Sequence, residues 1–171
     1  MPLLPGRRKR AWDEQPTDPA AVMLAADGRR RFSERAIAEA IALSASGPVA
    51  VVTIAKIHGT QFGLPNPGLM PTKQEMKDRQ QWVGRAVDAI ATAGGAADGQ
   101  VAVTRKAVKT LARIARARGV RTIVIDETPY TGLRRFVEGD VGEDLRRKLG
   151  REGVDVIVIP HDPADPPARK R

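Results

Sequence analysis

The chain has 171 residues, enough for one ordinary domain, and it carries 29 Lys and Arg against 20 Asp and Glu, a formal net charge of +9. The lack of cysteine excludes disulfide frameworks, cysteine zinc sites, iron–sulfur clusters and thiol nucleophiles, and two histidines are too few for an ordinary imidazole metal site. No apolar run approaches the roughly 20 residues of a membrane helix. The composition therefore favours a cytoplasmic globular protein that does not enter a membrane.

Both ends of the chain differ in composition from the centre. Residues 1–19 hold four prolines and the basic run GRRKR, and residues 163–171 read PADPPARKR. Neither segment has the periodicity of a helix or a strand, so both are expected to be flexible basic tails. Residues 20–162 are expected to form one domain.

The first half of this domain alternates between strand and helix patterns. The apolar run 21–26 (AVMLAA) predicts a strand that ends at Asp27-Gly28, a dipeptide suited to a tight turn. Ser33 can cap a helix whose apolar residues recur at helical spacing up to Gly47-Pro48. The run 49–55 (VAVVTIA) is rich in β-branched residues, which is typical of a strand covered on both faces.

The second half continues this alternation after the segment 57–73, whose glycine and proline content predicts a long loop. Segments whose apolar residues recur at helical spacing then alternate with short runs rich in β-branched residues to the end of the domain. The expected helices are 73–93, 106–118 and 139–149, and the expected strands are 100–104, 120–125 and 154–159. Four basic residues of the helix 106–118 are expected to face water: Lys109, Arg113, Arg116 and Arg118.

Regular alternation of strands and helices predicts an α/β fold. The expected architecture is a Rossmann-like three-layer sandwich, with a mostly parallel five-stranded sheet and helices on both faces. In such sheets, ligands bind beyond the carboxyl ends of the strands, where the loops after two neighbouring strands part. The crevice is expected between Asp27-Gly28 and the segment after Ile125.

Four stretches within residues 21–160 resemble the universal stress protein family. They are VMLAADG with SERAIAEAIALS, VAVVTIA, LARIARARGVRTIVID, and TGLRRFVEGDVGEDLRRKL with VDVIVIP. The resemblance implies the sheet order 3-2-1-4-5 and a homodimer formed by antiparallel pairing of the last strand, 154–159. It also implies a non-catalytic role in stress response or regulation. The nucleotide site it implies contains Asp27, Gly28, Ile54, Gly139 and Asp140, with the backbone near Ile54 reading adenine.

The phosphate-binding motif of that family reads Gly, two residues, Gly, nine residues, Gly and then Ser or Thr. Its positions fall at Asp126, Pro129, Gly139 and Asp140, so one glycine of the motif is present. A carboxylate at about 4 Å from a phosphate oxygen costs on the order of several kcal/mol. The resemblance therefore predicts a degenerate site that does not hold ATP in the family's manner, and no cofactor is assigned. An alternative ligand is AMP or a cyclic nucleotide, held with help from Arg29–Arg31 and from Arg134 and Arg135 after the fourth strand.

Other classes of function find less support in the sequence. The three serines all lie around the first helix, away from either histidine, and the chain has no P-loop, so the protein is not expected to be an enzyme. A rival hypothesis is an accessory protein bound to RNA or the ribosome. Its phosphate-contacting surface would combine GRRKR, the helix 106–118 and ARKR. A protein partner is a further expectation for a regulatory module.

Overall fold

The structure is a computed structural model that describes residues 16–57, 70–128 and 139–162. The first fifteen residues, the C-terminal tail, most of the loop 57–73, Pro129, Arg134 and Arg135 lie outside these ranges. The predictions made for those segments stay predictions.

The described residues form a five-stranded sheet in the order β3-β2-β1-β4-β5, with every neighbouring pair parallel. The strands are β1 (Val22–Ala26), β2 (Val49–Lys56), β3 (Ala97–Thr104), β4 (Thr122–Asp126) and β5 (Asp155–Ile159). The helices are α1 (Glu34–Ser44), α2 (Lys73–Thr92), α3 (Ala107–Ala117) and α5 (Val141–Leu149), followed by the short 3-10 helix η2 (Gly150–Glu152). The predicted fold class and strand order are confirmed.

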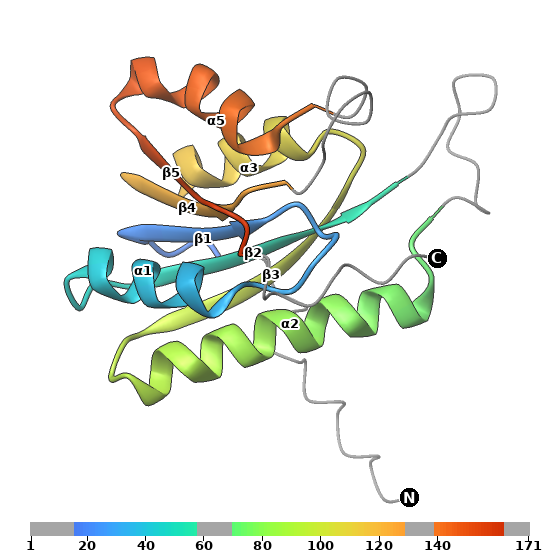
Figure 1. The fold of residues 1–171 in the computed structure, drawn as a ribbon, viewed down its shortest axis with the longest axis horizontal. Helices are drawn as coiled ribbons and strands as arrows, with labels where there is room; N and C mark the ends of the chain where they lie inside the picture. The colour runs from blue at the N-terminus through green and yellow to red at the C-terminus, as the bar shows by residue number, and fades with distance from the viewer. Residues whose placement is uncertain (1–15, 58–69, 129–138, 163–171) are drawn as a thin grey trace, which may run out of the picture.

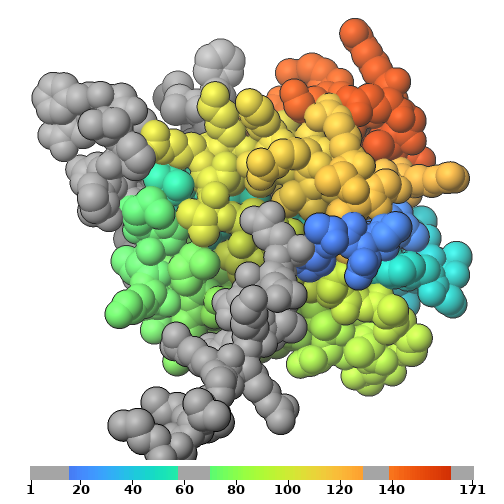
Figure 2. Space-filling model, turned by 180° about the vertical axis from the view of Figure 1, so that it is seen from behind, coloured from blue at the N-terminus to red at the C-terminus, as the bar shows by residue number. Residues whose placement is uncertain are grey.

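Two helix layers enclose the sheet, one on each face (Figure 1). One apolar cluster joins the sheet to α1 and α2, and a second joins it to α3 and α5. Seen from behind, the green residues of α2 lie below the yellow residues of α3 (Figure 2). Both faces of the central strands are therefore covered, which explains why β1 and β2 lack polar alternation.

The ends of the helices follow the capping residues. The Ser33 hydroxyl accepts a hydrogen bond from the Ala36 amide and begins α1. At the start of α2, Thr72 and Glu75 form a reciprocal capping box, which satisfies two backbone amides that the helix leaves free. None of the described helices is long and apolar enough to cross a membrane.

Strand β3 begins three residues earlier than the sequence pattern indicates. The pattern fails there because Asp98 and Gly99 interrupt the apolar run, yet both lie in register with β2. A side chain at Gly99 would overlap Val83 of α2, so the glycine allows this helix to approach the strand closely.

Arg118 is buried, and the prediction that it faces water is wrong. Its guanidinium is 1% exposed and donates two hydrogen bonds to the Asp98 carboxylate, at 2.6 and 2.5 Å. A third donor, Nε, binds the Asp18 carbonyl at 2.7 Å. The helical periodicity missed this contact because Arg118 follows the end of α3 and turns back toward β3.

Arg116 makes a different ion pair, at the surface. It binds Glu152 through Nε at 2.7 Å and Nη2 at 2.5 Å, and both side chains are over 40% exposed. The hydrogen bond from Arg116 lowers the pKa of Glu152 below its ordinary value. Two of the four cations expected along α3 are thus already paired, which weakens the hypothesis of an RNA-binding helix.

Candidate functional site

The carboxyl ends of β1 and β4 lie side by side at the centre of the sheet, and their following segments diverge to opposite faces. β1 leads into α1, on one face, whereas the chain after β4 reaches α5, on the other (Figure 1). This is the topological switch point at which ligands bind in open α/β sheets. Two cavities flank it, one on each side of the sheet.

The larger cavity lies on the α3 and α5 side and has a volume of about 340 Å³. We call it the basic cavity because six of its lining residues are cationic: Arg29, Lys56, Arg105, Lys106, Lys109 and Lys148. The described acidic residues that line it are Asp27 and Asp144. The carboxyl ends of β1, β2 and β3 supply the first part of this wall, and α3 and α5 supply the rest.

Both acids of the basic cavity already have a cationic neighbour. Asp27 accepts a hydrogen bond from the Arg29 amide at 3.0 Å, and its second oxygen lies 3.7 Å from Arg29 Nε. Asp144 pairs with Arg147 at 3.4 Å. Within the described ranges, the side chains of Lys56, Lys106 and Lys109 form no hydrogen bond or ion pair. Lys148 forms none either, although its charge helps to lower the pKa of Glu152. The cavity therefore holds positive charge that the described protein groups do not neutralise.

Among these cations, Arg105 has a hydrogen-bond donor that the described protein groups do not satisfy. Its Nη2 atom is buried and has no hydrogen-bond acceptor among the described residues. A buried guanidinium nitrogen without an acceptor is costly, so such groups are usually satisfied by a water, an ion or a ligand. The adjacent α3 begins at Ala107 without a side-chain cap, which leaves its first amides available to the same cavity.

Of the five residues predicted for a nucleotide site, the structure brings Asp27 and Gly139 to the basic cavity. Gly28 and Ile54 instead meet each other. Gly28 has a φ of +84° and lies so close to the Ile54 carbonyl that a Cβ would overlap its oxygen. That carbonyl also accepts a hydrogen bond from Arg79 Nε at 3.1 Å, and Ile54 is fully buried.

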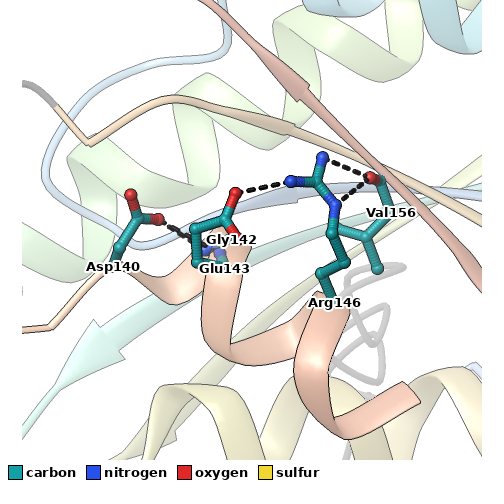
Figure 3. A network of polar contacts seen from close by, with 5 residues as sticks. All are labelled: Asp140, Gly142, Glu143, Arg146 and Val156. Carbon is teal, nitrogen blue, oxygen red and sulfur yellow. Dashed lines mark hydrogen bonds and ion pairs between the residues drawn. The ribbon is translucent and has the colours of Figure 1, made fainter. Parts of the chain in front are cut away.

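Asp140, the fifth of these residues, caps α5 (Figure 3). One of its carboxylate oxygens accepts from the Gly142 and Glu143 amides, at 3.0 and 3.2 Å. A carboxylate at a helix N-terminus is stabilised by the helix dipole. Its neighbours Gly139 and Val141 line the basic cavity, whereas Asp140 itself is not among the lining residues.

Asp126 lies on the opposite face from the basic cavity, which corrects the expectation that it would face the phosphates. Along β4, Ile125 packs in the α3 and α5 cluster and Val124 in the α1 and α2 cluster, so Asp126 follows Val124. Its two oxygens accept from the Ser33 amide at 3.0 Å and the Ser33 hydroxyl at 2.5 Å. The carboxylate thus fixes the start of α1, and it does not oppose an anion in the basic cavity.

Arg30 connects the loops that follow β1, β4 and β5 by hydrogen bonds. Its guanidinium donates to the Glu127 carbonyl and meets His161 Nδ1, both at 2.8 Å. The Glu127 carboxylate in turn accepts from the His161 amide at 3.2 Å. The three consecutive arginines therefore have different surroundings and do not act together on one phosphate. Arg29 lines the basic cavity, Arg30 links loops of the protein, and Arg31 is exposed to solvent.

Sequence reasoning missed most of the cations in the basic cavity. Lys56 and Arg105 each stand at or just after the end of a strand, which is the signal that could have indicated them. Lys109 was expected to face water, and no role was predicted for Lys148, which lies in the last turn of α5. No group of three or more described His, Asp and Glu residues could hold a metal ion.

No protein-family model matches the sequence, and no curated protein matches it. Solved structures do match. A universal stress protein family member from Burkholderia pseudomallei is 19% identical, with a TM-score of 0.57, covering 83% of this chain and 97% of its own. The universal stress protein of Archaeoglobus fulgidus in complex with dAMP is 21% identical, with a TM-score of 0.54 and coverages of 82% and 96%.

A universal stress protein in complex with cAMP is 14% identical, with a TM-score of 0.55, and the match covers 84% of this chain and 98% of that protein. Each match spans nearly the whole of the other protein. The chain therefore has the fold of the universal stress proteins.

Proposed function

We propose that this protein is a non-catalytic binding module of the universal stress protein type, and that its ligand is an adenine nucleotide with one phosphate group, AMP or a cyclic nucleotide. The observation that carries the proposal is the unneutralised positive charge of the basic cavity, with the buried Arg105 Nη2 as its most specific element. Two proteins of the same fold were solved with dAMP and cAMP, which supports this ligand class.

The size of the basic cavity fits a ligand of this kind. Small-molecule sites occupy roughly 300–1,000 Å³, and this cavity, at about 340 Å³, lies at the small end of that range. Asp27 provides a hydrogen-bond acceptor for the ribose or the base, and the lysines and Arg105 face the phosphate. Phosphate binding here depends on side-chain cations, which replace the glycine-rich backbone loop of the family. The ligand acts by occupying the site, and no chemical step is assigned.

Isothermal titration calorimetry tests this proposal. AMP and cAMP are expected to bind, and adenosine is expected to bind at least about ten-fold more weakly, because it cannot satisfy the cations. Arg105→Ala is expected to weaken AMP binding about 10- to 100-fold, the loss typical of one charged hydrogen bond. The matched control is Arg113→Ala, an exposed arginine of α3 that does not line the cavity. Equal affinities in the two variants, or no binding by either nucleotide, would contradict the proposal.

The proposal also includes association of two copies along β5. In this edge strand the Asp155 amide and the Ile159 carbonyl bond toward β4, so the backbone groups of Val156 point outward. The Val156 carbonyl accepts from Arg146 of α5, at 3.0 Å from Nη2 and 3.3 Å from Nε (Figure 3). A partner strand would have to compete with this guanidinium, since covering an edge is how proteins oppose pairing.

Removal of Arg146 is therefore expected to strengthen this association. Arg146→Ala frees an outward carbonyl and should lower the dissociation constant of the dimer about ten-fold, which corresponds to roughly one hydrogen bond. Sedimentation equilibrium measures this directly. Arg147→Ala is the control, because its neighbouring, exposed guanidinium pairs with Asp144 and not with β5. An unchanged or weaker association in Arg146→Ala would place the interface elsewhere.

A further inference from the structure

The second cavity lies on the other side of the sheet, against α1 and α2, and has a volume of about 200 Å³. It shares no described lining residue with the basic cavity. We call it the Trp82 cavity and define it by Arg31, Ile37, Trp82, Arg85, Ala86 and Ala89. Its inner end reaches Asp126 and His161 at the switch point.

One wall of the Trp82 cavity is apolar because of the spacing along α2. Trp82, Ala86 and Ala89 are four and three residues apart, so they share one face of the helix. The two alanines leave room beside the indole ring, and Ile37 of α1 closes the other side. Arg79 lies over the indole, 5.7 Å from the ring centroid to its Cζ, and stabilises the position of the ring.

The charges at the inner end are already satisfied. Both oxygens of Asp126 accept hydrogen bonds from Ser33, and Arg30 is bound to Glu127 and His161. These groups shape the floor and offer no free charge to a ligand.

The charges at the rim are different. Arg31 and Arg85 are both exposed, and neither forms a hydrogen bond or ion pair with any described residue. The one acidic residue at the rim, Glu34, stands in the first turn of α1, where the helix dipole favours its charge. The cavity thus combines an aromatic and aliphatic wall with an excess of guanidinium groups at its mouth.

We propose that the Trp82 cavity binds a small aromatic carboxylate, with its ring against Trp82 and the two alanines and its carboxylate at Arg85 and Arg31. Planar guanidinium groups match carboxylates in geometry, and an aromatic ring gains from contact with the indole. The volume, below the roughly 300 Å³ of ordinary small-molecule sites, restricts the ligand to about one ring. This site is independent of the nucleotide proposed for the basic cavity.

The test uses phenylacetate as the probe and the indole N–H resonance of Trp82 as the readout, in the full-length protein. The other tryptophan, Trp12, is replaced by phenylalanine so that one indole signal remains. Phenylacetate is expected to shift this resonance in a saturable manner. Phenylacetamide, which lacks the charge, and acetate, which lacks the ring, are each expected to bind at least about ten-fold more weakly.

Two variants locate the site. Arg85→Gln is expected to weaken phenylacetate binding about ten-fold, whereas Arg113→Gln, on the opposite helix layer, leaves it unchanged. Ala89→Leu fills the cavity and is expected to abolish binding while the circular dichroism spectrum stays that of the wild type. An indole resonance that phenylacetate does not move would overturn the proposal. Equal binding of phenylacetamide, or binding that survives Ala89→Leu in a folded protein, would overturn it as well.

Discussion

Gly28→Ala is expected to remove about 4 kcal/mol or more of the unfolding free energy, a large part of the 5–15 kcal/mol typical of a domain. The new Cβ would overlap the carbonyl oxygen of Ile54 and lie 2.7 Å from its carbonyl carbon. That carbonyl belongs to β2, a strand buried along nearly its whole length, so it cannot move aside without breaking pairs with its neighbours. The change also forces a side chain onto a φ of +84°.

Gly94 allows the effect of the steric overlap to be measured apart from the effect of the positive φ. It has the same φ of +84°, but a Cβ there would meet no atom within 4 Å. Gly94→Ala should therefore cost only the conformational penalty, about 1–2 kcal/mol. Urea unfolding followed by circular dichroism compares the two variants under one set of conditions. Similar losses in both would show that the contact between Gly28 and Ile54 contributes nothing, and that the backbone angle alone requires glycine.

This contact also bears on the candidate site. The resemblance to the universal stress proteins places Gly28 and Ile54 in the nucleotide site as two separate contributors. In the structure they hold the carboxyl ends of β1 and β2 together, and Arg79 binds the same carbonyl from α2. Neither residue lines the basic cavity, so their role is to support the strand ends that do. The side chains of Asp27, which precedes Gly28, and of Lys56, two residues after Ile54, reach the cavity.

The fold was predictable from the sequence because its information is local. Four of the five strands are short apolar runs, each helix has its own apolar spacing, and α1, α2 and α5 also have side-chain caps. The handedness of the crossovers then restricts how parallel strands connect. The start of β3 was missed because Asp98 and Gly99 have low strand propensity, and their places are set by contacts with Arg118 and Val83 that are distant in sequence.

The candidate site was less predictable because it depends on which face each side chain reaches. A shift of one position along a strand reverses the face, and this separates Asp126 from the basic cavity while Asp27 reaches it. The cations of the basic cavity come from four segments that meet only in the folded chain. Motif spacing detects the glycine pattern of a backbone cradle, but it has no comparable signal for lysines gathered from separate elements.

The second large effect is expected at Asp98, the partner of the buried Arg118. Asp98→Ala should lower the unfolding free energy by about 3 kcal/mol, since breaking one side of a buried pair leaves an uncompensated charge. The guanidinium of Arg118 is 1% exposed and would keep only the Asp18 carbonyl as a described partner. This loss of unfolding free energy is at the lower end of the range for broken buried ion pairs, because Asp98 is itself 35% exposed and its charge is partly hydrated.

The pair of Arg116 and Glu152 provides the matched control. It has the same chemistry and comparable distances, but both side chains are more than 40% exposed. Glu152→Ala should therefore change stability far less than Asp98→Ala. Because the pKa of Glu152 is lowered in the folded state, its contribution is present above the ordinary pKa of a glutamate and is lost as the pH falls through the lowered value.

Urea unfolding of both variants at neutral pH distinguishes burial from the mere presence of an ion pair. If burial determines how much an ion pair contributes to stability, Asp98→Ala lowers the urea concentration at the unfolding midpoint strongly and Glu152→Ala hardly changes it. Asp98→Asn, which keeps a hydrogen-bond acceptor for Arg118 but removes the negative charge, should lie between the wild type and Asp98→Ala. Equal shifts in the Asp98→Ala and Glu152→Ala variants would mean that water replaces Asp98 at the guanidinium. In that case the closure of β3 against the end of α3 would depend on the apolar contacts of α3 alone.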